Sequence, residues 1–283
     1  MRQALAAALG REVAELVPVA GGDLNAAYRA TLADGREVFV KTAPDAVAGA
    51  YAAEAAGLRW IAEARGGPPV PEVLAVDERF LALGWVPGGG TLDEQALGRS
   101  LALLHRAGAP GPGAPPPGTE GPLRLGPLEL PNDPAGDWPA FYAQRRLLEP
   151  AAIAARRGAL NAAGLRAVEA VAARIDVLAG PAEPTARLHG DLWTGNVLAG
   201  ADGRPWLIDP AAHGGHREVD LAMLELFGSP GPALYAAYDE VWPRAEGARE
   251  RVALWQLFPL LVHAILFGGS YGAAVRRAAE RYG

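Results

Sequence analysis

The segment from residue 189 to residue 209 contains a predicted β-hairpin with polar side chains at both ends. Two short apolar runs, 197–199 and 205–208, are separated by a turn that contains an Asp-Gly pair, which is a strong hairpin signal. Asn196 leads into the first run and Asp209 ends the second. A hairpin brings its ends together, so these two side chains should converge although 13 positions separate them. Any fold of the chain must accommodate this convergence.

A third polar side chain, Asp191, lies five residues before Asn196 on the same short loop. In phosphoryl transfer, an Asp accepts the proton of a substrate hydroxyl, while an Asn and a second Asp hold magnesium. Hard cations such as magnesium take a few carboxylates together with phosphate oxygens. The pattern therefore predicts phosphoryl transfer, with Asp191 as the base and Asn196 and Asp209 as metal ligands. The alternative is that these residues only serve turns and strand ends, which Asp and Asn favour.

Lys41 is the only lysine, and the other 25 of the 26 basic residues are arginine. A lone lysine at the end of a predicted strand indicates a site that needs a compact ammonium, such as a phosphate site, although a chance surface lysine is the alternative. In the predicted helix 47–64, Glu54 shares a face with Leu58 and Ile61, so its carboxylate should point inward and need a partner. We expect Glu54 to pair with Lys41 and orient it toward phosphate.

The stretch 19–28 reads as a strand, a glycine turn and a second strand. Backbone amides at such a turn can cover phosphates, which makes Gly21, Gly22 and Asn25 candidate nucleotide-binding residues. The stretch is neither Gly-x-Gly-x-x-Gly nor a Walker sequence, and this argues against a P-loop NTPase.

Motifs along the whole chain match one known family. The tryptophan between Asp191 and Asn196 and the Asp-Pro-Ala after the hairpin discriminate most, because protein kinases resemble His-Arg-Asp and Asp-Phe-Gly there. The matching segments are 21–28, 39–41, 101–105, 138–142 with 146–147, 189–196, 208–211, 215–222 and 266–271. On these motifs the chain resembles a fructosamine kinase, also called ketosamine-3-kinase, in the protein-kinase-like and aminoglycoside-phosphotransferase-like group.

The resemblance implies an α+β, protein-kinase-like bilobal fold with ATP and Mg²⁺ as cofactors. Residues 1–84 would form a small β-rich N-lobe with one helix that binds the nucleotide phosphates. Residues 85–283 would form a larger, mainly helical C-lobe with the catalytic loop, the metal ligands and the substrate site. By position, the carbonyl of Gly84 and the amide of Val86 would read the adenine edge. Gly84 departs from the acidic residue expected there, but backbone atoms make these contacts.

The resemblance also implies that the acceptor is the sugar 3-hydroxyl of a ketosamine of the fructosamine or ribulosamine type, and that its phosphorylation leads to deglycation. The residues alone support only phosphorylation of a small alcohol. Trp193, His216 and Asp133 are the candidate substrate-site residues; the amine carrier is a free amine or a protein. Three alternatives stay open: a same-fold kinase of an aminoglycoside, choline or homoserine, a non-catalytic binding module, and a kinase that acts on protein side chains.

Several remaining polar residues have predicted structural roles. We expect His189 to brace the catalytic loop by hydrogen bonding, and Asp220 to act as a helix N-cap or as another brace for that loop. His213 and His216 near Asp220 resemble a metal pair, but no third ligand is evident, so zinc is not predicted. His263 lies in a helical pattern and is expected in the core or at an interface.

Composition narrows the class of protein further. Half of the 283 residues are apolar, so a sizeable core is available. A net charge of -6 without a basic cluster gives no footprint for nucleic acid or an anionic membrane. The absence of cysteine excludes disulfides and fits a cytoplasmic location. The first 15 residues predict an amphipathic helix rather than a signal peptide, the apolar stretch 252–267 predicts a core helix, and a monomer is favoured.

Overall fold

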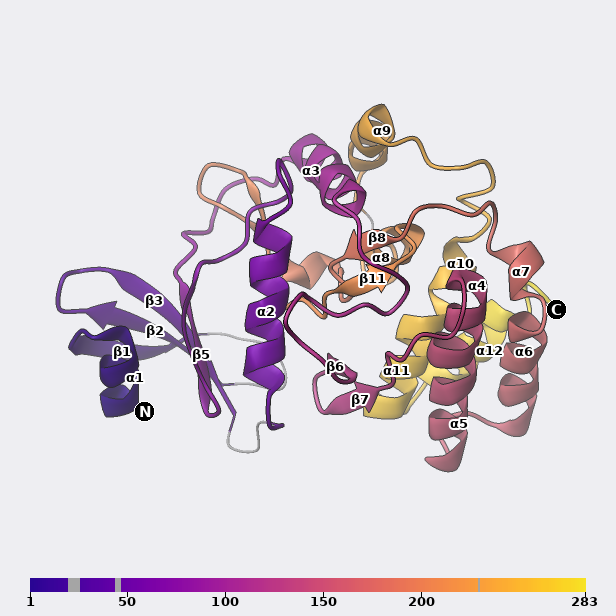
Figure 1. Cartoon of the computed structure of the whole chain (residues 1–283), viewed down its shortest axis with the longest axis horizontal. Helices are drawn as coiled ribbons and strands as arrows, with labels where there is room; N and C mark the ends of the chain where they lie inside the picture. Colours follow the sequence, from indigo (N-terminus) through magenta and orange to yellow (C-terminus); the bar gives the residue numbers. More distant parts are fainter. Residues whose placement is uncertain (20–25, 44–46, 229) are drawn as a thin grey trace.

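The computed structural model describes residues 1–19, 26–43, 47–228 and 230–283. A five-stranded antiparallel sheet lies at one end of the molecule, and helices make up most of the other end (Figure 1). The strand order is β1-β2-β3-β5-β4. The elements of this N-terminal region are α1 (Arg2–Leu9), β1 (Val13–Val19), β2 (Ala26–Leu32), β3 (Glu37–Thr42), α2 (Ala50–Ala62), β4 (Val73–Asp77) and β5 (Phe80–Gly84).

Side chains alternate between the two faces of this sheet, and the alternation places Lys41. Val38 and Val40 of β3 belong to an apolar cluster with Leu5 of α1. Phe39 packs instead against the cluster that α2 forms with the sheet. Lys41 has the same parity as Phe39, so its side chain leaves the sheet on the α2 side. This is the side that carries Glu54.

Among its described residues the N-terminal region has two helices, α1 and α2, where the family resemblance implied an N-lobe with one helix. The helix expected over the first 15 residues is also shorter, because α1 ends at Leu9 and β1 begins at Val13. Gly10 adopts the left-handed conformation (φ 63°) and its amide bonds back to the last turn, which is the usual way to stop a helix. Helix α1 covers one face of the sheet and α2 covers the other.

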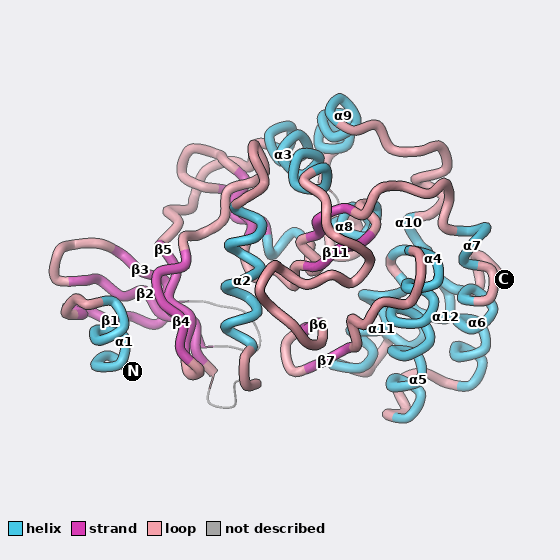
Figure 2. Tube along the Cα trace, viewed as in Figure 1, coloured by secondary structure: helices cyan, strands magenta, loops and turns pink. Residues whose placement is uncertain are grey.

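The C-terminal region is mainly helical, as predicted; most of its helices lie at the end opposite the sheet, while α3, α8 and α9 lie nearer the middle (Figure 2). It contains three two-stranded antiparallel ladders, β6–β7, β8–β11 and β9–β10. Its elements are α3 (Glu94–Arg106), β6 (Leu123–Leu125), β7 (Leu128–Leu130), α4 (Trp138–Phe141), a π-helix (Tyr142–Leu148), α5 (Glu149–Arg156), α6 (Ala162–Ala172), α7 (Ile175–Leu178), β8 (Ala186–Leu188), a 3₁₀ turn (Thr194–Asn196), β9 (Val197–Ala199), β10 (Pro205–Leu207), β11 (His213–Gly215), α8 (Glu218–Leu224), α9 (Pro232–Val241), α10 (Val252–Trp255), α11 (Leu257–Phe267) and α12 (Tyr271–Ala279).

The predicted core helix over 252–267 is buried, but it is divided into α10 and α11 at Gln256. Among the described residues, no helix combines the length and the apolarity needed to cross a membrane. The Pro- and Gly-rich stretch 107–122 contains no helix or strand. Its middle is nevertheless packed rather than exposed, because Gly113 donates its amide to Gly214 O (2.8 Å) beside β11.

The segment that follows β5 is fixed to the β9–β10 hairpin. The amide of Ala201 donates to Pro87 O (2.8 Å), and the amide of Asp93 donates to Gly203 O (3.1 Å). A Cβ added to Gly90 would lie 2.1 Å from Gly200 O, so only glycine fits there. The segment that connects the two regions therefore packs directly against the hairpin that carries the candidate metal ligands.

Candidate active site

The predicted hairpin is confirmed, and it brings Asn196 and Asp209 to the same end. Val197 of β9 pairs with Leu207 of β10, and the amide of Ile208 donates to Asn196 O (3.1 Å). Asp209 has φ 54°, and it is the one non-glycine residue with positive φ among the residues that the structure describes. A non-glycine residue held in this region is strained, and such strain concentrates at functional sites. The conformation turns the Asp209 carboxylate away from the strand direction.

Lys41 connects the two regions of the molecule. Its Nζ donates to Glu54 Oε2 on α2 (2.8 Å) and to Asp209 Oδ1 after the hairpin (3.1 Å). The predicted pairing of Lys41 with Glu54 is confirmed as a contact. Gly57, one turn after Glu54, allows α2 to approach the hairpin, because a Cβ there would lie 3.3 Å from Pro210 Cγ. The close approach places the ammonium between carboxylates from both regions.

The charges around Lys41 do not balance. Burial opposes the charged form of Lys41, but the Glu54 and Asp209 carboxylates outweigh burial and raise its pKa, so the ammonium stays protonated. Burial raises the pKa of Glu54 to about 7, with the Asp209 charge adding to the rise and Lys41 opposing it. Glu54 Oε1 is buried without a hydrogen-bond partner. Two carboxylates thus share one ammonium, and the excess negative charge favours binding of a cation nearby.

Asp191 and Asn196 are in direct contact, as their spacing on one loop predicted. Asn196 Nδ2 donates to Asp191 O (2.8 Å) and to Asp191 Oδ2 (3.3 Å). Because the amide nitrogen is committed to Asp191, the oxygen Oδ1 is the end of the side chain that remains for a metal ion. Burial, followed by the charge of Asp209, raises the pKa of Asp191 to about 6. A carboxylate with a raised pKa is a stronger base, which suits proton abstraction.

The pKa of Asp191 gives a direct test of how close the two aspartates are. In the protein without nucleotide, we expect an apparent pKa near 6 for the Asp191 carboxyl, measured by carbon-13 NMR titration. In the Asp209→Asn variant the neighbouring negative charge is removed, so the pKa of Asp191 should fall toward its ordinary value of 3.8. Exposed Asp176→Asn serves as the control and should leave the Asp191 titration unchanged. An Asp191 pKa that does not respond to Asp209→Asn would contradict the proposed proximity.

His189 braces the catalytic loop in the predicted way. Its Nε2 contacts Ile208 O (2.9 Å), a carbonyl that can only accept, so the proton is on Nε2 and Nδ1 can accept from the amide of Asp191 (3.3 Å). Burial lowers the pKa of His189, which keeps the ring neutral and preserves this tautomer. The ring therefore ties the base loop to the residue that precedes Asp209.

Asp220 is a brace for the catalytic loop rather than a helix N-cap. It lies inside the first turn of α8, and its two oxygens accept from the amides of His189 (2.7 Å) and Gly190 (3.0 Å). His105 Nε2 contacts Asp220 Oδ2 (3.3 Å), and Tyr238 lies behind His105. Burial opposes ionisation of Asp220, but the hydrogen bond and charge of His105 lead the interactions that hold its pKa below the ordinary value. Sequence spacing gave no signal for the His105 and Tyr238 contacts.

The oxygen donors at the end of the hairpin fit magnesium better than zinc. Asp191, Asn196 and Asp209 offer hard carboxylate and amide oxygens, with no cysteine in the chain. In the described ranges, no three His, Asp or Glu side chains converge into a complete metal site. A cation here would therefore need further ligands from a bound phosphate, which is how magnesium is held in sites of phosphoryl transfer.

One candidate substrate-site residue, His216, lies away from the catalytic loop. His216 follows Gly215, which pairs with Ala186 at the end of the β8–β11 ladder away from His189. The ring is buried and stacked on Trp255 (centroids 5.1 Å apart), so the structure does not bring His216 to the catalytic loop. Asp133 is a surface residue 3.9 Å from Arg145.

The nucleotide-binding candidates are placed only in part. Gly84 ends β5, and Val86 follows in the segment that is fixed to the hairpin. Gly21, Gly22 and Asn25 lie outside the described residues.

Trp193, a candidate substrate-site residue, follows Asp191 by two residues, and its indole lies over Gly195, where a Cβ would come within 2.2 Å of the ring. This need for glycine at position 195 escaped the sequence analysis.

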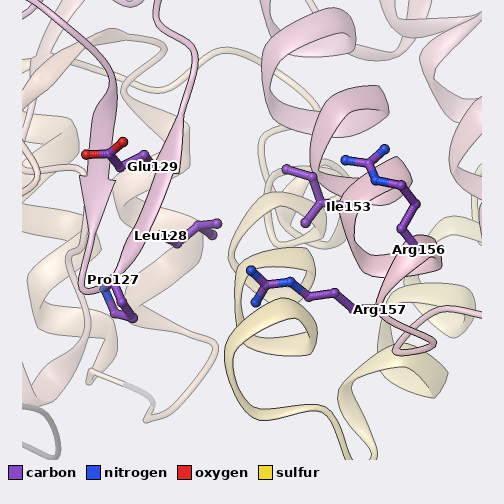
Figure 3. A pocket seen from close by; sticks show the side chains of 6 residues that line it. All are labelled: Pro127, Leu128, Glu129, Ile153, Arg156 and Arg157. Atoms are coloured by element: carbon purple, nitrogen blue, oxygen red, sulfur yellow. The ribbon is translucent and has the colours of Figure 1, made fainter. Parts of the chain in front are cut away.

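A separate hollow of about 440 Å³ lies between the β6–β7 hairpin and the end of α5. Figure 3 shows Arg157 reaching toward the hairpin across this hollow. The residues that line it are Pro127, Leu128, Glu129, Ile153, Arg156 and Arg157. None of them belongs to the set around Lys41 and Asp191, so the hollow is distinct from the candidate active site.

The fold and the site define a phosphotransferase of the protein-kinase-like class. The fold is shared with an ADP-bound aminoglycoside phosphotransferase, at a TM-score of 0.67 and 15% identity over 99% of this chain and 97% of that one. The family model described as Fructosamine kinase matches residues 1–282, and the chain belongs to that family. Its members are named as kinases, so the reaction is transfer of a phosphoryl group to a hydroxyl group.

Individual relatives agree with this assignment. A curated protein of Thermus thermophilus, named as a probable ketoamine kinase, is 38% identical, with 93% of this chain and 92% of the relative covered. A Thermobifida fusca protein of known crystal structure, described as a putative fructosamine-3-kinase, is 44% identical, with a TM-score of 0.91 over 99% of this chain and 97% of that one. The resemblance inferred from the motifs is confirmed.

Proposed function

We propose that this protein is an ATP-dependent kinase that phosphorylates the sugar 3-hydroxyl of a ketosamine of the fructosamine or ribulosamine type. The observation that carries the proposal is the placement of Lys41 Nζ 2.8 Å from Glu54 and 3.1 Å from Asp209. This geometry supports a role for the Lys41 ammonium in binding phosphate, for Asp209 as a metal ligand and for Asp191, on the adjoining loop, as the base. Such a set serves phosphoryl transfer to an alcohol.

In the proposed mechanism, residues 1–84 bind the nucleotide and residues 85–283 carry the catalytic loop, the metal ligands and the acceptor site. Lys41, oriented by Glu54, holds the phosphates, and the backbone at Gly21, Gly22 and Asn25 covers them. The carbonyl of Gly84 and the amide of Val86 read the adenine edge. Backbone contacts of this kind tolerate a change of side chain at position 84.

The transfer step requires a base and charge neutralisation. Asp191 accepts the proton of the acceptor hydroxyl while the hydroxyl oxygen bonds to the γ-phosphorus of ATP. The bond from this phosphorus to the leaving oxygen of ADP breaks in the same step. Asn196 and Asp209 would hold magnesium, which when bound neutralises charge on the phosphate oxygens. The Trp193 indole is 37% exposed two residues after the base, and we assign it to the acceptor side.

Phosphorylation of the 3-hydroxyl would lead to deglycation for a chemical reason. Loss of a proton from carbon 1 of a ketosamine gives an enol across carbons 1 and 2, from which a phosphate on carbon 3 is expelled. Hydrolysis of the resulting imine then frees the amine. Phosphorylation at this position would therefore free the amine, whether small or protein-borne, and release inorganic phosphate and the carbon chain as a 3-deoxy dicarbonyl. A cytoplasmic location stays a prediction from the sequence.

A substrate panel tests the proposed function. Purified protein with ATP and magnesium should turn over fructosyl-amines or ribulosyl-amines with kcat/KM about 100-fold above choline, homoserine or an aminoglycoside, because one alcohol is positioned at the base and the others are not. ADP release gives the rate, and phosphorus NMR coupling to the proton on carbon 3 gives the position. A higher kcat/KM for another small alcohol would favour the alternative kinase, and no ADP release with any alcohol would favour a binding module.

A further inference from the structure

A continuous group of aromatic rings extends from the catalytic loop to the C-terminal helices. Trp193 meets Phe227 edge to face, with centroids 6.2 Å apart, and Phe227 lies 4.6 Å from the ring of His263 on α11. His263 lies 5.1 Å from Tyr271 on α12 and 5.5 Å from Phe267. We call these five residues the aromatic wall. Its last two members come from the Leu-Phe-Gly-Gly-Ser-Tyr motif, to which the mechanism assigns no role.

Glycines hold the aromatic wall against the catalytic loop. A Cβ on Gly228 would lie 2.7 Å from Thr194 Cγ2, so the segment after Phe227 passes directly over the 3₁₀ turn. Between α11 and α12, Gly268 and Gly269 both have positive φ (64° and 60°), and this turn returns the chain so that Phe267 and Tyr271 face the same cluster. The wall is therefore a fixed continuation of the loop that carries the base.

The rings of the wall are partly open and no arginine covers them. Trp193 is 37% exposed and Phe267 is 52% exposed, while Phe227, His263 and Tyr271 are half-buried. Elsewhere in the described residues, arginines stack on eight rings: Trp60, Trp85, Phe141, Trp206, Tyr235, Tyr238, Trp242 and Phe258. Although the chain has 25 arginines, none of those described is stacked on a ring of the wall.

His263 adds an acceptor rather than a positive charge to the wall. Its Nδ1 contacts Pro259 O (2.8 Å), and because a carbonyl only accepts, the proton is on Nδ1. Burial lowers the pKa of His263, so the ring is neutral at pH 7 and Nε2 carries a lone pair. The wall thus presents ring faces and a nitrogen acceptor, and both attract a cationic N–H group.

We propose that the aromatic wall is the acceptor subsite for the protonated amine arm of the ketosamine, with the ammonium held against Tyr271 and Phe267 while the sugar lies at Trp193. The inference rests on the proposed function, since it specifies which end of the acceptor is recognised. The secondary amine of a ketosamine is cationic at neutral pH, and its alkyl arm would cover the apolar ring surface. An aminoglycoside, choline or homoserine would not place a sugar ring and a single amine in this order.

The test compares two matched acceptors that differ only in the atom bonded to carbon 1, and therefore in its charge and its N–H donors. One is a 1-deoxy-1-alkylamino-fructose, and the other is the 1-O-alkyl fructose in which an ether oxygen replaces the amine. Dissociation constants are measured by calorimetry in the presence of ADP and magnesium, and KM by ADP release. Wild-type protein should bind the amine about 5-fold more tightly than the ether, as expected for a cation on exposed rings.

Three variants separate the role of the rings from their bulk. Tyr271→Leu and Phe267→Leu should each weaken binding of the amine about 5-fold and reduce its advantage over the ether, whereas Tyr271→Phe keeps the ring and should retain the preference. The KM for ATP and the melting temperature check that the fold is intact. Equal binding of amine and ether by the wild type, or a preference that survives both leucine variants, would overturn the inference.

The binding readout also separates this inference from the proposed function. If the wild type binds the amine but does not turn it over, and Tyr271→Leu weakens this binding, the subsite exists but the proposed reaction is wrong. Turnover of both probes with equal KM would mean that the reaction is right and the subsite is wrong.

Discussion

Asp191→Asn is expected to lower kcat by about 10²- to 10⁴-fold, which is the usual contribution of a positioned general base. The amide is close in shape to the carboxylate, and its oxygen can still accept from Asn196 Nδ2, now 3.3 Å from Asp191 Oδ2. The loop should therefore keep its conformation. Removing a negative charge beside the phosphate site should leave ATP binding unchanged or tighter, measured by calorimetry, while ADP release reports turnover.

The control for this variant is Asp176→Asn on α7, where the aspartate is exposed and far from the loop in sequence. It should keep wild-type kcat. Turnover by Asp191→Asn within about 5-fold of the wild type would be too small a loss for a base and would assign the proton to another acceptor. If Asp191→Asn lost both ATP binding and turnover, the result would indicate that the conformation of the loop had changed, and not only that the base had been removed.

Local patterns in the sequence predicted the parts of the site that lie on single elements. The Asp-Gly turn between two apolar runs predicted the hairpin, and with it the convergence of Asn196 and Asp209. The helical spacing of Glu54, Leu58 and Ile61 predicted an inward carboxylate, and the ion pair with Lys41 is present. These signals are reliable because period and turn chemistry act within a few residues.

Contacts between distant segments carried no such signal. The two amides that Asp220 binds lie 30 and 31 residues away, and the sequence offered an N-cap as an equal alternative. The three-residue strands β6 and β7 are too short for an alternating pattern, and the π-helix from Tyr142 has no distinct period in the sequence. His216 was a candidate substrate-site residue, but its ring is used in core stacking.

Replacing Lys41 by methionine should remove activity and also destabilise the fold, and the two effects can be separated. Loss of the ammonium leaves Glu54 and Asp209 without their shared partner. Breaking a buried ion pair costs about 3–5 kcal/mol in the free energy of unfolding, and the cost here should be lower because Asp209 is only partly buried. Turnover should fall about 10²- to 10³-fold, as for loss of one charge-stabilising donor. The Lys41→Met, Glu54→Gln double variant should recover most of the stability and none of the turnover.

The effect of pH on the stability of the Lys41→Met variant follows from the pKa of Glu54. The pKa of Glu54 is already raised to about 7, and removal of Lys41 raises it further because the opposing charge is lost. A carboxyl whose pKa is higher in the folded state than in the unfolded state favours folding at low pH and loses that advantage as pH rises through the folded pKa. Lys41→Met should therefore be more destabilised at pH 8 than at pH 5, measured by urea unfolding. The double variant should lose this dependence.

Two further variants make the Lys41 result specific. Glu63→Gln, at the exposed end of the same helix region, should change neither stability nor turnover. Lys41→Arg keeps the charge, but the planar guanidinium is wider than the ammonium that fits between Glu54 and Asp209, so turnover should stay low while part of the stability returns. Full activity in Lys41→Arg would show that the site needs only a positive charge, and the argument from a single lysine among 25 arginines would fail.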